Sequence, residues 1–388
     1  MKIVYVIDSL ASRGGAERIL SEKMSYLAEQ YNYDVYVITC YQDQEATPNA
    51  YYLSERVKQI NLNIPYYSQY KYKYPQRLWV KYSMHRNLLK GLRSKVIQID
   101  PDILIGLGYF MADIVSSIKC RAAKIIESHE ARIFTMSDFG LYRSWISKTY
   151  MNFYRKRYFR TVEKNTDVVV TLTLGDAQEW RKAKRVEVIP NFTMMRPSSV
   201  SYNIDCKRII SVGRLEWQKG YDRLIEIWQI VTKKHPQWEL VIFGDGTLEQ
   251  ELKSQIKTAG LTNMSIHPFT KDISQEYSNS SIFVLSSRFE GFSLVLLEAM
   301  QHGLPCVAFD CPFGPKDVIN DNVCGYIIKD HDKEEFADKI CSLIEDSPKR
   351  VQFSKAAIQR AAFFGVDNVM AKWISLFDSL SYNEYMQR

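Results

Sequence analysis

Short runs of apolar and β-branched residues alternate with longer stretches of helical spacing along most of the chain. The first run, KIVYVI at residues 2–7, is followed by two glycines and then by residues 16–30, where apolar side chains recur every three or four positions. Parallel strands need a long connection that is usually a helix, so this alternation predicts β-α units on a parallel sheet. The expected class is therefore α/β.

The pattern ends and then begins again in the middle of the chain. A length of 388 residues suits two domains of roughly 100–200 residues each. We expect a linker near residues 190–205, where prolines and polar residues cluster. The predicted fold is two Rossmann-like, doubly wound parallel-sheet domains that face each other across a cleft. Expected strands are 2–7, 34–40, 102–107, 124–129 and 167–172, then 208–213, 239–244, 281–287 and 305–309.

Charge is spread unevenly over the two halves. Residues 1–190 hold 29 Lys and Arg against 19 Asp and Glu, about +10, and the remainder holds 22 against 25, about −3, which together give the net +7. Such asymmetry indicates that the two domains have different partners.

The seven cysteines form no C-x-x-C pair and no zinc spacing. An odd number of them without a secretory signal indicates reduced thiols in the cytosol. The N-terminal apolar run lacks a cleavage site of small residues, and no apolar stretch reaches 18 residues, so we expect neither a signal peptide nor a membrane span.

Two cations follow the first strand of the second half. Gly213 and Arg214 end that strand, and Lys219 comes five residues later. An Arg fork and a Lys point charge can bind one phosphate together, although they could equally be two solvated surface cations. Gly244, which follows the next strand, permits a close approach of backbone to a ligand or simply makes a turn.

Two glutamates flank an apolar segment, SRFEGFSLVLLEAM. Glu290 precedes the start of an expected helix, whose N-terminus favours negative charge, and a capping role is the alternative. Glu298 lies inside the helix among apolar residues, where a buried carboxylate needs a hydrogen-bonding partner. A bound ligand could be that partner.

In the first half, Gly14-Gly15 follows the first strand, and its amides could hold a phosphate. The dinucleotide pattern G-x-G-x-x-G is absent there, which disfavours a nicotinamide dehydrogenase.

The segments GGAER, GRLEWQKG, GDG and SSRFEGFSLVLLEAMQHGLPCVAFDCPFGPKDVI together resemble the retaining glycosyltransferases of family 4. The resemblance covers nearly the whole chain and is densest from about residue 205 to 330. It implies the two-domain GT-B fold and transfer of a sugar from a nucleotide-sugar. The last segment resembles the branch that builds bacterial surface polysaccharides from UDP-hexoses or UDP-N-acetylhexosamines.

The resemblance also implies roles for single residues. Arg214 and Lys219 match the pair that binds the donor diphosphate, with Gly213 and Gly244 beside it. Glu290 matches the carboxylate that contacts the donor sugar, and Glu298 the one that accepts from the ribose. The amides matched to the phosphates and sugar belong to Gly291, Phe292, Ser293 and Leu294.

Three further matches concern the rest of the donor. His129 matches a histidine that faces the donor sugar, with a buried structural histidine as the alternative. Gly15 matches the loop beside the diphosphate and the acceptor. Phe269 lies in the loop that would contact the base, where Pro268 replaces the usual glycine. His267 and His302 are interpreted as structural.

The resemblance assigns residues 1–195 to the acceptor, 196–365 to the nucleotide-sugar, and 366–388 to a helix that crosses back to the first domain or packs within the second. No residue is placed as a nucleophile, so the implied reaction is a same-face displacement in which electrostatic stabilisation of the leaving diphosphate dominates. No metal and no other cofactor is expected.

Two segments of the first half are basic and aromatic. Residues 71–95 contain eight Lys or Arg and no acid, and residues 142–164 contain seven against one Glu. Segments of this composition are typical of proteins that bind an anionic membrane surface, and a solvated helix face is the alternative. We expect a cytoplasmic enzyme peripherally associated with the inner face of the membrane, with a glycan or polyprenyl-diphosphate-linked acceptor. Nucleic acid is not expected, because no binding motif accompanies the basic text.

Two other functions remain open from the sequence. A GT-B nucleotide-sugar epimerase would share the donor site, and a silent GT-B scaffold subunit would share only the fold. The complete set of Arg214, Lys219, Glu290 and Glu298 favours the transferase over both.

Overall fold

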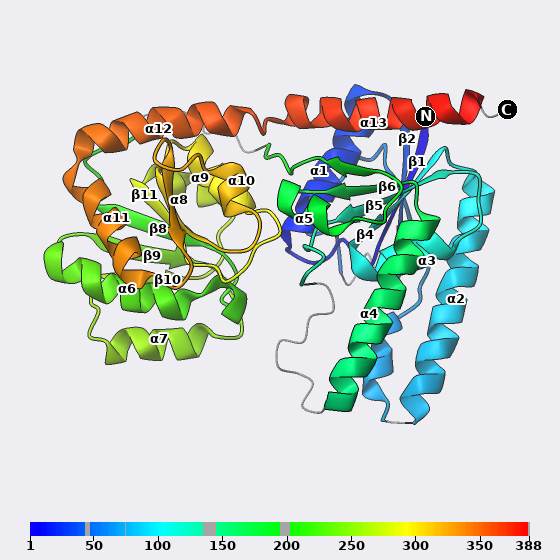
Figure 1. The fold of residues 1–388 in the computed structure, drawn as a ribbon, viewed down its shortest axis with the longest axis horizontal. Coiled ribbons are helices and arrows are strands. Elements are labelled where there is room, and N and C mark those ends of the chain that lie inside the picture. Colours follow the sequence, from blue (N-terminus) through cyan, green and yellow to red (C-terminus); the bar gives the residue numbers. More distant parts are fainter. Residues whose placement is uncertain (43–46, 74, 135–144, 195–201, 387–388) are drawn as a thin grey trace. The chain divides into compact units, whose positions relative to one another are not determined.

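The computed structural model describes residues 1–42, 47–73, 75–134, 145–194 and 202–386 (Figure 1). The chain divides into two compact units. Unit 1 is Met1–Ile189 with Met370–Arg388, and unit 2 is Pro190–Val369. Part of the predicted linker, residues 195–201, lies outside the described residues.

Unit 1 is built on a seven-stranded parallel sheet in the order β3-β2-β1-β4-β5-β6-β7. Its central strands are buried on both faces, which is why they are almost wholly apolar. The strands are β1 Lys2–Ile7, β2 Asp34–Thr39, β3 Lys58–Asn61, β4 Ile103–Leu107, β5 Ala123–Ser128, β6 Val168–Thr171 and β7 Val186–Val188.

Helices cover both faces of this sheet (Figure 1). They are η1 Tyr66–Lys71, α1 Gly15–Gln30, α2 Gln76–Ile99, α3 Gly108–Ser117, α4 Trp145–Asn165 and α5 Leu174–Glu179, with η1 a 3₁₀ helix. The last helix of the chain, α13 (Val366–Met386), belongs to unit 1 from Met370 onward. Arg185, just before β7, donates from Nη1 to Ser379 Oγ of α13 at 2.9 Å.

Unit 2 repeats the plan with six parallel strands in the order β10-β9-β8-β11-β12-β13. The strands are β8 Arg208–Val212, β9 Glu239–Phe243, β10 Met264–His267, β11 Ile282–Leu285, β12 Cys306–Asp310 and β13 Gly325–Lys329. The helices are η2 Trp217–Lys219, α6 Tyr221–Lys234, α7 Glu249–Thr258, α8 Ile273–Ser278, α9 Leu294–Gln301, α10 Pro315–Val318, α11 Lys333–Glu345 and α12 Ser347–Ala362, with η2 a 3₁₀ turn.

Both sheets therefore have the same winding. The chain moves outward from β1 to β3, returns to the other side of β1, and continues outward through β4 to β7. Unit 2 does the same around β8 and β11. In each unit the order reverses beside the first strand, and doubly wound sheets bind ligands at the carboxyl ends of the strands at such a reversal. The predicted fold of two Rossmann-like parallel-sheet domains is confirmed.

The sequence patterns missed four strands, β3, β7, β10 and β13. Three of them, β3, β7 and β10, have three or four residues each and partly exposed side chains. Their sequences are therefore less apolar than those of the central strands. No helix in the described ranges is long and apolar enough to cross a membrane. All seven cysteines are free thiols.

Candidate active site

The reversal point of unit 2 brings a lysine and a glutamate together. Lys219 ends the turn after β8, and Glu290 follows the neighbouring strand β11. Lys219 Nζ lies 2.7 Å from Glu290 Oε1, and Ser287 Oγ donates to the same oxygen at 2.6 Å. The side chains of Lys219 and Glu290 are 14% and 6% exposed. The ion pair is thus largely out of water, where charges interact more strongly.

The turn that carries Lys219 depends on Gly220. Its φ is +65°, a left-handed conformation, and a Cβ at this position would lie 2.2 Å from the carbonyl oxygen of Ser286. Only glycine allows the backbone to approach that closely. Ser286 Oγ in turn donates to the carbonyl of Lys219 at 3.0 Å. The two strand ends are therefore fastened together on either side of Gly220.

Arg288 fastens the same turn from its other end, and the sequence patterns did not single it out. Its Nη1 donates to the carbonyl of Trp217 at 2.7 Å, and its guanidinium pairs with both oxygens of Asp222 at 2.9 and 2.6 Å. Burial raises the pKa of Asp222, but the hydrogen bonds and charge of Arg288 outweigh burial and lower it, so the pair is ionised at neutral pH. No spacing in the sequence would have revealed these contacts, which join residues 66 and 71 positions apart.

Arg214 lies at the exposed edge of this turn. Its Nη2 donates to Gln218 Oε1 at 3.3 Å, and Gln218 Nε2 donates to the carbonyl of Phe289 at 3.0 Å. An exposed guanidinium and a mostly buried ammonium thus share one turn. This arrangement suits an anion with one part enclosed and one part near solvent, such as a diphosphate.

The segment after Glu290 ends at a helix N-terminus. Gly291 and Phe292 lead to Ser293, the residue before Leu294, which opens α9. Ser293 Oγ is buried and has no hydrogen-bond partner among the described residues. A buried hydroxyl without a partner is costly, and a helix N-terminus binds anions through its free amides. The amides and hydroxyl of this segment can therefore bind an anionic ligand.

Glu298 is 4% exposed, one turn into α9. Its Oε2 accepts from the Tyr277 hydroxyl at 3.1 Å, so a protein side chain supplies at least part of the partnership that burial requires. His302 lies one turn later and contacts the Glu298 carbonyl through Nδ1 and Ser274 Oγ through Nε2, each at 2.7 Å. Burial lowers the pKa of His302 and favours its neutral form.

The loops after β9 and β10 complete this edge of the sheet. A Cβ at Gly244 would lie 2.0 Å from the carbonyl oxygen of Gly213, so the two strand ends touch through their backbones. Asp245 Oδ1 accepts from the backbone amide of Phe269 at 3.1 Å. The Phe269 ring is 44% exposed, and an exposed ring offers a stacking face. Unit 2 thus places all its predicted donor residues at or beside the carboxyl ends of its strands.

His129 and Gly15 belong to unit 1. His129 comes directly after β5, with its side chain 10% exposed, and its Nε2 lies 3.0 Å from Glu127 Oε2. Gly15 is the first residue of α1, after the loop that follows β1. Both lie at carboxyl ends of strands of that sheet, as their sequence positions indicate.

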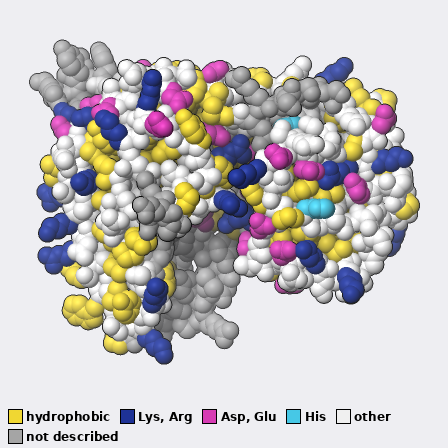
Figure 2. All heavy atoms as spheres, turned by 180° about the vertical axis from the view of Figure 1, so that it is seen from behind, with side chains coloured by type: hydrophobic (Ala, Val, Ile, Leu, Met, Phe, Trp, Pro, Cys, Tyr) yellow, Lys and Arg dark blue, Asp and Glu magenta, His cyan; other side chains and the backbone are white. Residues whose placement is uncertain are grey.

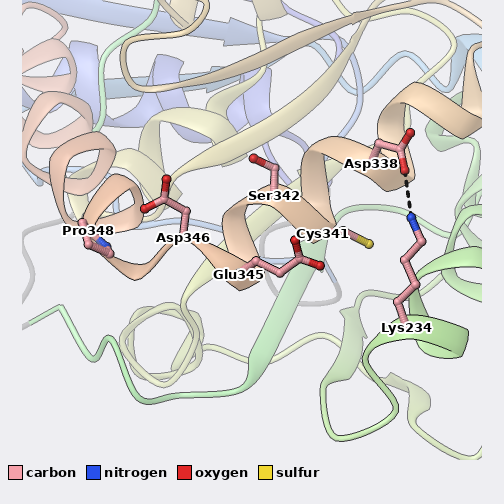
Figure 3. Close-up of a pocket in the computed structure, with 7 residues that line it drawn as sticks. All are labelled: Lys234, Asp338, Cys341, Ser342, Glu345, Asp346 and Pro348. Carbon is pink, nitrogen blue, oxygen red and sulfur yellow. Dashed lines mark hydrogen bonds and ion pairs between the residues drawn. The ribbon is translucent and has the colours of Figure 1, made fainter.

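A surface cavity of unit 2 is unrelated to these residues. It has a volume of about 380 Å³ and lies between the end of α6 and the helices α11 and α12 (Figure 3). Figure 3 shows Lys234 paired with Asp338 there, with Glu345 and Asp346 nearby. Helix α6 leads away from the end of β8, so its last residue lies at the opposite edge of the sheet. Carboxylates also outnumber the one lysine, which makes the cavity unsuited to a phosphate.

Within the described ranges, no group of three or more His, Cys, Asp or Glu side chains could hold a metal ion.

Residues 200–360 match the family described as glycosyl transferases group 1, and this range contains every residue of unit 2 discussed above. The chain is a glycosyltransferase. Its resemblance to glycosyltransferases, predicted from its motifs, is therefore confirmed, and so is its assignment as an enzyme.

Two relatives match almost from end to end. An uncharacterised glycosyltransferase of Haemophilus influenzae is 27% identical over 383 residues, which cover 96% of this chain and 98% of the relative. The amylovoran biosynthesis glycosyltransferase AmsD of Erwinia amylovora is 29% identical over 383 residues, with the same coverage.

A solved structure shares the fold. The S. aureus TarM variant in complex with fondaparinux, alpha-GlcNAc-glycerol and UDP matches with a TM-score of 0.74 and 16% identity. The match covers 97% of this chain and 99% of that one. The GT-B fold of this glycosyltransferase agrees with that expected from its sequence.

Proposed function

We propose that this glycosyltransferase is a retaining hexosyltransferase of bacterial surface polysaccharide biosynthesis. It moves an N-acetylhexosamine or a hexose from a UDP-sugar to a glycan or to a polyprenyl-diphosphate-linked acceptor. The amylovoran relative supports the pathway class, and the UDP bound to the S. aureus protein supports the donor class.

The observation that carries the proposal is the Lys219–Glu290 pair at the reversal point of unit 2. Negative charge develops on the diphosphate as its bond to the sugar breaks. Lys219, enclosed by protein, and Arg214, at the rim, stabilise that charge, and such electrostatic stabilisation commonly contributes more to catalysis than any other effect. Both hydrogen bonds described for Glu290 use Oε1. We assign its Oε2 to the hydroxyls of the donor sugar.

The start of α9 supports a phosphate beside these residues. Ser293 has a buried hydroxyl without a partner in the described part of the chain, and the amides that open α9 lie next to it. We assign them to the phosphate oxygens. Glu298, one turn further on, is assigned to the ribose, which it would share with the Tyr277 hydroxyl.

Retention is proposed from the chemistry of the departing group. The bond from the anomeric carbon to the phosphate oxygen breaks, the bond to the acceptor oxygen forms on the same face, and the phosphate oxygen takes the acceptor proton. Cations that stabilise the leaving diphosphate are the groups such a step needs, and Arg214 and Lys219 supply them. The alpha-GlcNAc-glycerol present with UDP in the S. aureus complex is consistent with retention from an α-linked nucleotide-sugar.

We further propose that α2 of unit 1 binds an anionic membrane surface, on the inner face of the cytoplasmic membrane. The buried side chains of α2 lie in its second half, from Leu88 onward. In the first half Trp79 is 76% exposed and Tyr82 is 62% exposed, with Lys81 and Arg86 exposed beside them. In Figure 1 this half extends beyond the sheet, and Figure 2 shows hydrophobic and basic side chains together over this part of unit 1. Exposed aromatic rings among cations suit a lipid headgroup layer.

The basic segment 142–164 gives weaker support. Residues 142–144 lie outside the described residues. Tyr158 and Phe159 of α4 are buried against the core, and Arg155 donates to the carbonyls of Arg132 and Ile133. Phe153, by contrast, is 67% exposed.

The donor proposal is tested by thermal unfolding with UDP, GDP, ADP or NAD at millimolar concentration. A ligand at about 100 times its dissociation constant stabilises a protein by about 2.7 kcal/mol. We expect UDP alone to raise the unfolding temperature and Lys219→Ala to abolish the rise. A response to another nucleotide, or to UDP in Lys219→Ala as strongly as in the wild type, would contradict the donor assignment. The anomeric configuration of the transferred sugar, read by NMR, then tests retention.

The membrane proposal is tested by sedimentation with vesicles of phosphatidylcholine and phosphatidylglycerol. We expect Trp79→Ser/Tyr82→Ser to lose most of the binding, and high salt to weaken it. The matched control is Phe363→Ser, which removes an equally exposed ring (68%) from unit 2. Equal binding by all three proteins would contradict the role of α2.

A further inference from the structure

Unit 1 contains a fully buried ion pair that the proposed chemistry does not use. Lys23 of α1 is 1% exposed, and its Nζ lies 2.5 and 2.6 Å from the two carboxylate oxygens of Glu127 in β5, which is 3% exposed. The two residues are 104 positions apart in the sequence. Removing both charges from water carries a large desolvation cost, so their retention at this position asks for an explanation.

Aromatic rings enclose the ammonium group. Lys23 Nζ lies 3.9 Å from the ring centroid of Trp373, on α13, and 5.4 Å from that of Tyr5, on β1. Burial lowers the pKa of Lys23, although Glu127 opposes this. For Glu127 burial acts to raise the pKa, but Lys23 and His129 outweigh it and lower the value, so the carboxylate is ionised at neutral pH.

Stability alone does not account for this pair. Well-packed apolar side chains of similar volume often stabilise a core as well as a buried ion pair does, or better. What apolar side chains could not do is hold the third member of the cluster. Glu127 Oε2, which Lys23 contacts, also lies 3.0 Å from His129 Nε2.

This contact fixes the state of the imidazole. An ionised carboxylate can only accept hydrogen bonds, so Nε2 of His129 carries the proton that it donates to Glu127. In the neutral ring Nδ1 is then the acceptor and is available to a hydroxyl group. Lys23 neutralises the carboxylate, so that the imidazole faces an ion pair and not an isolated anion.

We propose that Glu127 and Lys23 are positioning residues that hold His129 in one orientation and one tautomer, with Nδ1 ready to accept from a hydroxyl of the donor sugar. This inference rests on the proposed function, together with the resemblance that matches His129 to a histidine facing the donor sugar. Glu127 acts on His129 directly, and Lys23 acts through Glu127. Neither of them touches the substrate.

The test separates positioning from stability with four variants. Lys23→Met should be the least stable, because it leaves an unpaired buried carboxylate. Lys23→Met/Glu127→Leu should recover most of that stability and still transfer sugar about 10- to 100-fold more slowly than the wild type, because His129 is no longer held. Glu127→Leu alone completes a double-mutant cycle with Lys23→Met and the leucine double variant. Lys23→Met/Glu127→Gln keeps an acceptor next to Nε2 and should regain much of the rate.

The contrary result is equally clear. If the double variant with leucine recovers both its unfolding temperature and its transfer rate, the pair only stabilises the core and the inference is wrong. If the leucine double variant fails to fold, comparison of the glutamine double variant with Glu127→Leu decides, since Glu127→Leu lacks the acceptor and a positioning role requires the rate to return with it.

A second measurement does not depend on transfer. Nitrogen-15 NMR of the histidines in the full chain, with His129 assigned through His129→Asn, reports which ring nitrogen carries the proton. We expect the Nε2–H form in the wild type and a mixture in Glu127→Leu. An unchanged tautomer in Glu127→Leu would overturn the inference even if the protein transferred no sugar.

The same variants separate this inference from the donor proposal. The UDP-dependent rise in unfolding temperature depends on unit 2, so we expect it in all four variants. If UDP does not raise the unfolding temperature of the wild type, the proposed function is wrong. If UDP raises it in all four variants and their transfer rates equal that of the wild type, only the role of Lys23 and Glu127 is wrong.

Discussion

Each unit of this glycosyltransferase contains a short Lys–Glu ion pair, and the two pairs differ in how far they are closed to solvent. In unit 1 the side chains of Lys23 and Glu127 are 1% and 3% exposed, with aromatic rings over the ammonium group. In unit 2 those of Lys219 and Glu290 are 14% and 6% exposed, at the reversal point of the sheet. A sealed pair can only orient its neighbours. A partly open pair can exchange a hydrogen bond with a ligand.

The difference also reflects how each pair is built. Lys219 and Glu290 come from two turns that directly follow neighbouring strands, and glycines determine the shape of the first turn. Lys23 comes from the interior of a helix, and Glu127 from the interior of a strand. Turn residues can be located in the sequence because an apolar strand precedes them and glycines stand next to them. Charged residues inside a helix or strand have no such marker.

The largest expected effect is on the open pair. Lys219→Ala should lower the transfer rate by about 10²–10³-fold, the usual cost of removing one group that stabilises developing charge. Steady-state kinetics with the UDP-sugar donor measures it. The control is Lys253→Ala, which breaks an exposed pair with Glu249 in the same unit and should leave the rate unchanged. Equal rates for both variants would remove Lys219 from the donor site.

The next effect concerns the turn beneath that pair. Gly220→Ala and Gly260→Ala both place alanine at a left-handed φ, +65° and +68°, but only at Gly220 does the new Cβ meet backbone, the Ser286 carbonyl. Left-handed strain alone costs about 1–2 kcal/mol, so Gly260→Ala should lose about that much and Gly220→Ala more. Chemical denaturation of both variants provides the measurement. Equal losses would mean that the strand ends do not touch as described.

A smaller effect is expected for the residue that holds the turn from its other end. Arg288→Met should raise the KM for the donor about tenfold, roughly 1.4 kcal/mol, because the Trp217 carbonyl and Asp222 lose the guanidinium that joins them. Arg223→Met is the matched control, since Arg223, the neighbour of Asp222 on α6, also forms an ion pair with an aspartate, Asp330. It should reduce stability and leave the KM unchanged. A raised KM in both variants would indicate general disorder of the unit and not positioning.

The smallest effect compares the two units as pH falls from about 7 to about 5. In unit 2 burial lowers the pKa of His302, so the stability it contributes is present above its ordinary pKa of 6.5 and is lost as the pH falls through that value. In unit 1 burial raises the pKa of Asp113, Glu130 and Asp176, so stability increases as these groups gain protons. Hydrogen exchange resolved by peptide should show opposite trends in the two units. His302→Gln should remove part of the loss in unit 2, and parallel trends would contradict the assignment.

The sequence was sufficient where a residue's role follows from its position on the chain. Apolar runs that alternate with segments of helical spacing predicted the parallel sheets, because each strand and each helix has its own periodicity of apolar residues. Glycines and charges immediately after those runs predicted the ligand edge of unit 2, since the carboxyl ends of parallel strands lie at one edge. Gly213, Arg214, Lys219 and Gly244 could all be selected in this way.

The rest was decided by tertiary structure. Arg288 reaches Trp217 across 71 residues, Tyr277 reaches Glu298 across 21, and Lys23 reaches Glu127 across 104. Neither Lys23 nor Tyr277 stands out in the sequence, because nothing local distinguishes a buried lysine from a solvated one on an amphipathic helix. Whether Lys23 is buried or solvated is decided only when α1, β5 and α13 pack together. That packing removes the ammonium group from water, and the buried charge then needs a carboxylate as its partner.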